Sequence, residues 1–354
     1  MPVSLATPNS NQSTTSNNIE ISVRGSWVTV PAISVEGKNI IVSGKWVKKG
    51  IVAAEEWLET EVEDPESCIR KLKEQQSHAL RADIFTFAQK LPGSSPQYEY
   101  PMEWDSVAAI HITSFKDWWE KLPQESRKNV RRSQKRGVVV MVRDLDDALI
   151  KGIIGVNNDS PVRQGRPYVH YGKTFDQVKK DQSSYLDRSV FVCAYLGEEL
   201  IGFMKMVCRG EVASILQMLP KASHQDKRPA NALLAKGVEL CEARRISYLT
   251  YGLLNYGNKR ESSLRDFKIR NGFEEMLTPR FYVPLNIWGS LCVKLKIHRG
   301  LLGILPPSVI RLAGKARAKW YNRKQSTSRC SSMSERSTCN RQMECSTPPA
   351  GSNT

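Results

Sequence analysis

The region from residue 189 to residue 285 contains the pattern that most restricts the fold. Three strand-like segments, SVFVCAYL, LIGFMKMVC and VASILQML, follow one another and are joined by two short turns that contain Gly197 and Gly210. Runs of apolar and β-branched residues separated by such turns predict an antiparallel meander. A helix beginning near Pro229, a strand SYLTYGLL, a helix beginning at Ser262 or Ser263 and a closing strand GFEEMLTPRFYVPL come next. This order predicts an α+β fold, with a mixed and mostly antiparallel sheet flanked by helices.

The rest of the chain divides into segments by composition. Residues 1–18 and 325–354 are polar and of low complexity, which predicts disorder. Residues 19–110 form an N-terminal α/β extension, which begins with the strand-like segments ISVRGSWVTV and NIIVSGKWV, and residues 111–290 form the main domain. The other elements expected are helices at 65–78 and 146–154, and strands at 83–88, 107–112 and 138–143.

The positive charge of the chain is concentrated in two segments. The sequence has 52 Lys and Arg against 36 Asp and Glu, a net charge of +16. Segment 127–136 contains six basic residues and segment 291–324 contains nine, and neither contains an acidic residue. Since these two segments account for nearly all of the excess, the charge is localised, which favours an anionic partner.

Each basic segment has two interpretations. Segment 127–136 lies between Pro123 and Gly137, which suit the start and the end of a helix, and its cations share one stripe. That stripe is either a contact for phosphates or anionic lipids, or a solvated helix face. In segment 291–324 apolar residues alternate with the cations, as in a helix that binds a membrane surface or one that packs on the main domain. No apolar run reaches the roughly 20 residues of a membrane-spanning helix.

The N-terminus and the cysteines predict a cytoplasmic protein. The first 18 residues lack the cationic start and the apolar stretch of a secretory signal. Five cysteines are spread singly, without the closely spaced ligand pairs of a zinc site, so we expect reduced thiols and no metal. Segment 291–324 would then contact the inner face of a membrane.

Three motifs, taken together, resemble those of one superfamily. LPQESRKNVRRSQKRGVVV is similar to its Arg-rich helix, glycine and strand, AYLGEELIGFMKMV to its first hairpin, and LRDFKIRNGFEE to its Phe-Lys-x-x-x-Gly-Phe element. The chain thus resembles the GNAT acyltransferases, particularly the Fem-type branch, over about residues 114–285. The resemblance implies a GNAT acyl-CoA N-acyltransferase fold and transfer of an acyl or aminoacyl group to a primary amine by direct attack in a ternary complex. Residues 19–110 are then either a degraded first GNAT lobe or an unrelated cap.

The resemblance also implies a donor with phosphate groups, such as an acyl-CoA. Backbone N–H groups and cations at a helix start bind phosphates, and the helix near Pro229 offers such a start. The donor-binding residues expected there are Lys227, Arg228, Ala230, Asn231 and Ala232. The superfamily usually has glycines at this loop, whereas this chain has Pro229 and Asn231. Aminoacyl-tRNA is therefore the alternative donor, and an exposed loop is the competing structural interpretation.

The catalytic residue expected from the resemblance is Lys268, a cation near the charge that develops during transfer. Tyr251 and Tyr256 lie at the end of the SYLTYG strand and could donate a proton to the leaving thiolate or ribose oxygen, or else serve only in packing.

The segment RPYVHYGK predicts a substrate-anion contact, or a structural turn. The substrate-binding residues expected here are Arg163, Arg166, His170, Tyr171 and Lys173. The acceptor would be the amine of a small molecule or of a cell-envelope precursor. The rival hypotheses are an RNA-binding module and a membrane-surface module, both without catalysis; against the first, the basic segments lack the interleaved aromatics of single-strand binders.

Overall fold

The computed structural model describes residues 16–23, 25–55, 61–75, 77–163, 166–255 and 262–300. The expected disordered ends lie outside these residues, apart from 16–18, which belong to a strand. Most of segment 291–324 also lies outside them. The first residues of that segment, up to Gly300, are described.

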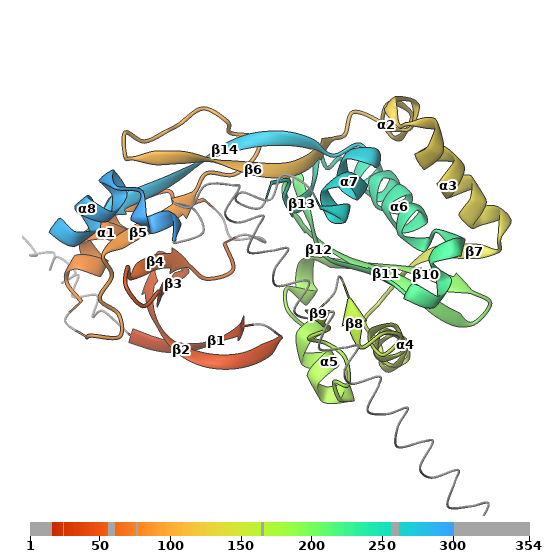
Figure 1. The fold of residues 1–354 in the computed structure, drawn as a ribbon, viewed down its shortest axis with the longest axis horizontal. Coiled ribbons are helices and arrows are strands. Elements are labelled where there is room, and N and C mark those ends of the chain that lie inside the picture. The colour runs from red at the N-terminus through yellow and green to blue at the C-terminus, as the bar shows by residue number, and fades with distance from the viewer. Residues whose placement is uncertain are drawn as a thin grey trace, which may run out of the picture. The chain divides into compact units, whose positions relative to one another are not determined.

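A single sheet of twelve strands runs through the described chain (Figure 1). Its order is β1-β2-β3-β4-β5-β14-β6-β13-β12-β11-β10-β7. The strands are β1 Ser16–Val23, β2 Ser26–Val35, β3 Lys38–Ser43, β4 Lys49–Val52, β5 Ile84–Ala88, β6 Met102–His111, β7 Val138–Arg143, β10 Ser189–Leu196, β11 Glu199–Arg209, β12 Val212–Pro220, β13 Tyr248–Leu253 and β14 Glu274–Pro284. A separate two-residue pair, β8 Val162–Arg163 and β9 Arg166–Pro167, forms a second small sheet.

Helices cover both faces of this sheet. They are α1 Pro65–Lys73, α2 Phe115–Lys121, α3 Gln124–Lys135, α4 Asp147–Asn157, α5 Phe175–Gln182, α6 Pro229–Ala243, α7 Ser263–Arg270 and α8 Ile287–Lys294. Helices α2, α3 and α6 share one core with the meander, and α4 and α5 share another core on its opposite face (Figure 1). None of the described helices is long and apolar enough to cross a bilayer.

The order of elements in the C-terminal half also occurs in the N-terminal half. In each half an antiparallel meander is followed by a helix and then by a strand parallel to the last meander strand, β4 with β5 and β12 with β13. The halves also exchange strands. β14 pairs with β5 of the N-terminal half, and β6 pairs with β13 of the C-terminal half. A second lobe of the same fold would have this arrangement.

The expected elements of residues 65–290 are confirmed, with shifts at their ends. The basic helix is α3, and the meander, α6, β13, α7 and β14 occur in the predicted order. Three boundaries were wrong by three residues or more. α4 ends at Asn157 instead of residue 154. β6 begins five residues earlier than expected, because it pairs along its length with β14, and α1 ends at Lys73 instead of residue 78.

The end of α7 shows how local sequence fixes the site described below. Ser262 caps the helix, its Oγ accepting from the N–H of Arg265 at 3.1 Å. At the other end Gly272 has a φ of +86°, and the N–H of Phe273 donates to the carbonyl of Lys268 at 3.0 Å. A side chain at position 272 would meet the indole of Trp118 at 2.8 Å, so glycine is required for both reasons.

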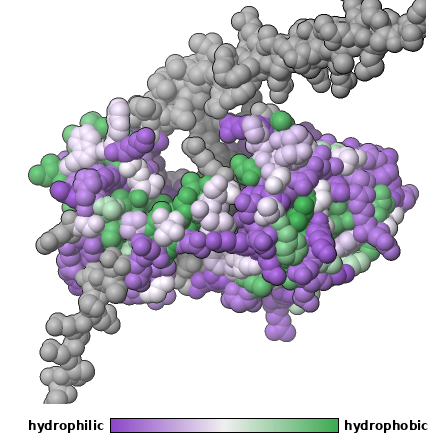
Figure 2. Space-filling model, turned by 90° about the horizontal axis from the view of Figure 1, so that it is seen from below, coloured by the Kyte–Doolittle hydropathy of each residue, from purple (hydrophilic) through white to green (hydrophobic). Residues whose placement is uncertain are grey.

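Seen from below, the surface is largely hydrophilic, with several separate hydrophobic patches (Figure 2).

Candidate active site

The parallel strands β12 and β13 diverge. They pair over only three residues each, 212–214 with 248–250, and the last pair is joined by a 2.7 Å hydrogen bond between the hydroxyls of Ser214 and Thr250. Beyond this point β12 continues to Pro220, paired with β11 alone among the described strands. One edge of β12 therefore presents backbone groups to which an extended ligand containing amides can bind.

Both strands bend where they part. Leu216 is an extra residue in β12, because Gln217 pairs with Lys205 and Ile215 pairs with Met206. β13 also has an extra residue between Thr250 and Leu253, next to Gly252 with a φ of +57°. Such bulges increase the local bend of a strand. Because the strands are parallel, their carboxyl ends and the helices that follow them lie at the same end of the sheet.

The start of α6 brings two basic regions together. Arg228 is the N-cap residue, in the left-handed conformation with a φ of +58° and without a side-chain cap. Asp226 joins Lys227, 3.2 Å away, to Arg136 from the end of α3, 3.1 Å away. Asp226 thus brings the end of α3 next to the start of α6, although the two are far apart in the sequence.

Two of the expected donor-binding residues already have structural partners. The N–H groups of Asn231 and Ala232 donate to the carbonyl of Arg228, at 3.2 and 3.4 Å, and the buried side chain of Asn231 donates to Asn271 at 2.8 Å. These donors hold the helix start and join it to α7, and the expected donor-binding role of Asn231 and Ala232 remains a prediction. Ala230 is half-buried in the first turn.

Lys268 and Tyr251 lie next to each other at the end of β13. The Nζ of Lys268 donates to the carbonyl of Leu253 at 2.8 Å and lies 4.7 Å from the centre of the Tyr251 ring. The side chain is fully buried, and this burial lowers the pKa of Lys268 to about 8. The catalytic roles of both residues remain predictions. Tyr256 lies outside the described residues.

An antiparallel meander, a helix, a diverging parallel strand, a helix and a closing strand thus occur in the order that the sequence predicts. The fold is that of the GNAT acyltransferases. Strand order and the divergence of β12 from β13 decide this assignment.

Solved structures with a similar architecture have little sequence identity to this chain. FemX is 10% identical, with a TM-score of 0.48, over 79% of this chain and 90% of its own. L-PGS from Bacillus licheniformis is 14% identical, with a TM-score of 0.45, over 73% of this chain and 85% of its own. A tandem GNAT protein from the clavulanic acid biosynthesis pathway is 9% identical, with a TM-score of 0.38, over 73% and 83%. No family model and no curated protein matches the sequence.

Residues of the expected substrate-anion cluster make hydrogen bonds that link α5 to other parts of the chain. Asp181 of α5 accepts from Lys173 at 2.6 Å, from the indole of Trp27 at 2.8 Å and contacts His170 at 3.2 Å. Burial alone would raise the pKa of Asp181, but the hydrogen bonds from these three partners lower it to about 2. Asp181 thus engages the side chains of both His170 and Lys173, and their expected role in binding a substrate anion remains a prediction.

Arg163 also has structural partners. Its guanidinium donates to the carbonyls of Pro220 and Val156, at 3.0 Å each, and stacks over the ring of Tyr168. These bonds tie the end of β12 to α4, and the expected substrate role of Arg163 remains a prediction. Arg166 and Tyr171 are exposed, and their expected substrate role remains a prediction.

A polar network that the sequence analysis missed lies just beyond β13. The Nδ2 of Asn255 donates to Glu275 at 2.7 Å and to Ser106 at 3.2 Å, and Ser106 donates to Glu275 at 2.6 Å. Arg265 of α7 donates to the Oδ1 of Asn255 at 3.0 Å. A polar residue directly after a strand was the available signal, but its partners come from β6, α7 and β14.

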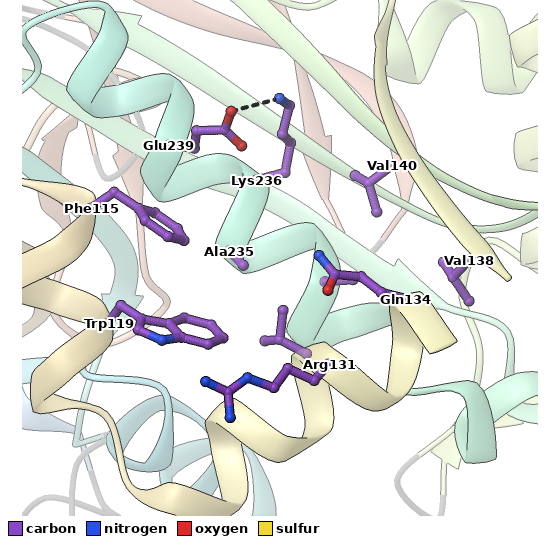
Figure 3. A pocket seen from close by; sticks show the side chains of 11 residues that line it. Phe115, Trp119, Arg131, Gln134, Val138, Val140, Ala235, Lys236 and Glu239 are labelled. Carbon is purple, nitrogen blue, oxygen red and sulfur yellow. Dashed lines mark hydrogen bonds and ion pairs between the residues drawn. The ribbon is translucent and has the colours of Figure 1, made fainter. Parts of the chain in front are cut away.

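A pocket of about 400 Å³ lies between α2, α3, α6 and β7 (Figure 3). Trp119 and Phe115 of α2 form one wall, and Arg131 of α3 lies 5.6 Å from the centre of the Trp119 ring. Lys236 and Glu239 of α6 pair across its rim at 3.1 Å (Figure 3). The pocket thus has apolar walls and a charged mouth. Among the described residues, no group of three or more His, Cys, Asp or Glu side chains is placed to hold a metal ion.

Proposed function

We propose that this protein transfers an acyl or aminoacyl group to a primary amine by direct attack in a ternary complex. The observation that carries the proposal is the divergence of β12 from β13, next to a helix start with an exposed cation, Arg228. The open edge of β12 suits an extended acyl-carrying arm, which would add to it through backbone hydrogen bonds. The cations at the start of α6 suit the phosphates to which such an arm is attached.

Aminoacyl-tRNA is the donor that these contacts support better than an acyl-CoA. At the start of α6, Pro229 has no N–H, and the amides of Asn231 and Ala232 are already engaged, so few donors remain for a compact pyrophosphate. In contrast, α3 and the α6 start together present cations over a wide area. A spread of cations suits a polyanion longer than a single pyrophosphate.

The chemistry requires an attacking amine, a stabilised oxyanion and a protonated leaving group. The amine nitrogen bonds to the acyl carbon and the ester or thioester bond breaks, while the proton that the amine gives up replaces the one that Tyr251 donates to the leaving group. Lys268 would stabilise the negative charge of the oxyanion from its position at the end of β13, where its ammonium binds the carbonyl of Leu253. Tyr251 would protonate the leaving ribose oxygen or thiolate.

The test is a pair of titrations of the purified protein, one with acetyl-CoA and one with aminoacyl-tRNA. We expect tRNA to bind more tightly, and Arg136→Ala combined with Arg228→Ala to weaken that binding and the rate of aminoacyl transfer to an amine. Lys116→Ala is the matched control, an exposed cation on α2 that is distant in sequence from both.

The outcomes separate the donor from the reaction. Saturable acetyl-CoA binding that the double variant abolishes would assign the donor to coenzyme A and retain the acyltransferase. Binding of tRNA without transfer to any amine would leave an RNA-binding module and refute the proposal.

A further inference from the structure

Helix α8 has an apolar face that the described chain does not cover. Its inner face is fixed: Cys292 is fully buried, and Gly289 lies so close to the carbonyl of Asp83 that a Cβ would meet it at 2.0 Å. The opposite stripe is also apolar, although it faces outward. Its exposed members are Ile287, Trp288, Leu291 and Leu295. Because surface helices normally place polar residues outward, this stripe indicates a contact surface.

A second exposed tryptophan extends this surface. Trp46, from the loop before β4, is 80% exposed, and Ile287 is 90% exposed. The indole N–H of Trp288 donates to the carbonyl of Trp46 at 3.2 Å, which fixes the two residues next to each other. We call Trp46, Ile287, Trp288, Leu291 and Leu295 the α8 surface.

Cations surround a hollow beside the α8 surface. The hollow has a volume of about 640 Å³, and its lining includes Lys45, Lys48 and Arg81 together with both tryptophans. Lys45 and Arg81 are exposed. The acid in the lining, Asp83, accepts from the N–H of Lys48 at 2.8 Å and from Asn286 at 2.9 Å, so each of its oxygens is already hydrogen-bonded within the protein.

The basic character continues along the chain. Lys294 and Lys296, on either side of Leu295 at the end of α8, are exposed. In the sequence beyond the described residues, positions 301–324 add six more cations and no acid. Positive charge therefore accompanies the apolar stripe on the hollow side and on the C-terminal side.

We infer that the α8 surface docks on an anionic lipid bilayer. Tryptophan side chains favour the bilayer interface, where the ring is apolar and the N–H reaches a polar partner. Ile287, Leu291 and Leu295 would enter the acyl-chain boundary, while Lys45 and Arg81 bind headgroup phosphates at the hollow. Nucleic acid fits less well, because outward aliphatic side chains contribute nothing to binding a phosphate backbone. This contact lies beyond the proposed transfer reaction and does not depend on it.

The test is co-sedimentation of the full-length protein with vesicles of phosphatidylcholine, alone or mixed with phosphatidylglycerol. The charge variant is Lys45→Glu with Arg81→Glu, and the apolar variant is Trp46→Ser with Ile287→Ser. Each cation near an anionic surface changes binding about fivefold, so the charge variant should bind the mixed vesicles at least roughly twentyfold more weakly. The apolar variant should lose the quenching of tryptophan fluorescence by brominated lipids.

The matched controls make the same kinds of substitution at positions outside the α8 surface. Trp104→Ser removes a tryptophan of β6 that is 48% exposed, and Lys116→Glu reverses a charge on α2 that is 84% exposed. Trp104 follows Glu103, which binds His298 directly after α8, so by strand alternation Trp104 points to the other face of the sheet. Both controls should bind vesicles as the unchanged protein does.

Three outcomes would overturn the inference. Equal binding to both kinds of vesicle would exclude an anionic surface. Unchanged binding in both test variants would mean that the α8 surface is covered in another way, for instance by residues 301–324 of the chain itself. Loss of tRNA retention in the test variants, with vesicle binding intact, would assign the surface to nucleic acid.

Discussion

Replacing Lys268 by methionine should separate catalysis from stability. The lysine is fully buried, and burial lowers its pKa from 10.5 to about 8. At about 1.4 kcal/mol per pKa unit, the buried charge costs the folded state about 3 kcal/mol at neutral pH. Methionine removes this cost but leaves the carbonyl of Leu253 without its 2.8 Å donor, a loss of about 1–3 kcal/mol. The free energy of unfolding at pH 7 should therefore change little.

The pH dependence of stability tests this reasoning directly. Between pH 8 and 10.5 the unfolded chain keeps the proton of Lys268, whereas the folded chain has released it. The unfolded state binds more protons, so the free energy of unfolding rises with pH across this window, by up to about 3 kcal/mol from this residue. Denaturant unfolding at a series of pH values should show a smaller rise in Lys268→Met.

Lys205 provides the matched control. It is also buried, its pKa is also lowered to about 8 by burial, and it binds the carbonyls of Gln182 and Ser184, in the core on the other face of the sheet. Lys205→Met should reduce the same rise with pH and leave transfer intact, whereas Lys268→Met should slow transfer about 100-fold or more. Normal transfer by Lys268→Met, or an unchanged pH profile, would refute the reasoning.

Two further predictions concern Asp181 and Tyr251. Asp181→Asn should lower the free energy of unfolding at pH 7 by about 3 kcal/mol, because Lys173 and His170 lose their buried acceptor. In the unchanged protein the pKa of about 2 means that about 2 kcal/mol of this stability is lost as the pH falls from 4 to 2. The control Asp187→Asn, which replaces an exposed acid nearby, should change neither value. Tyr251→Phe should slow transfer at least about tenfold without changing the unfolding midpoint, since a phenylalanine ring keeps the packing of that position; equal rates would exclude the proton-donor role.

Local patterns predicted the elements, but not the way in which distant elements meet. The Gly turns of the meander and the Pro-to-Gly limits of α3 are short-range signals, and the structure confirms them. The exchange of β6 and β14 leaves no such signal, because the residue pattern of a strand does not show which half of the chain it pairs with. The sequence likewise shows no internal repeat, although the order of elements occurs twice.

The candidate site shows the same limit. The resemblance to GNAT acyltransferases pointed to Lys268 and the end of the SYLTYG strand to Tyr251, and the structure brings the two side chains together. For His170 and Lys173, the two side chains were visible in the sequence, but their shared partner Asp181 was not recognised. Asp181 is only a few residues away, yet its third partner, Trp27, lies 154 positions earlier. The sequence shows where a basic residue is, but whether it is available to bind a ligand depends on the side chains that the fold places beside it.

The strand exchange has a consequence for synthesis on the ribosome. β5 ends at Ala88, but its neighbour β14 begins only at Glu274, so one side of β5 stays unpaired until most of the chain has emerged. A nascent N-terminal half therefore exposes an apolar strand edge, the kind of edge that pairs with other chains. Neither half can complete its sheet alone. A protein cut between the halves should recover only when both fragments are present together.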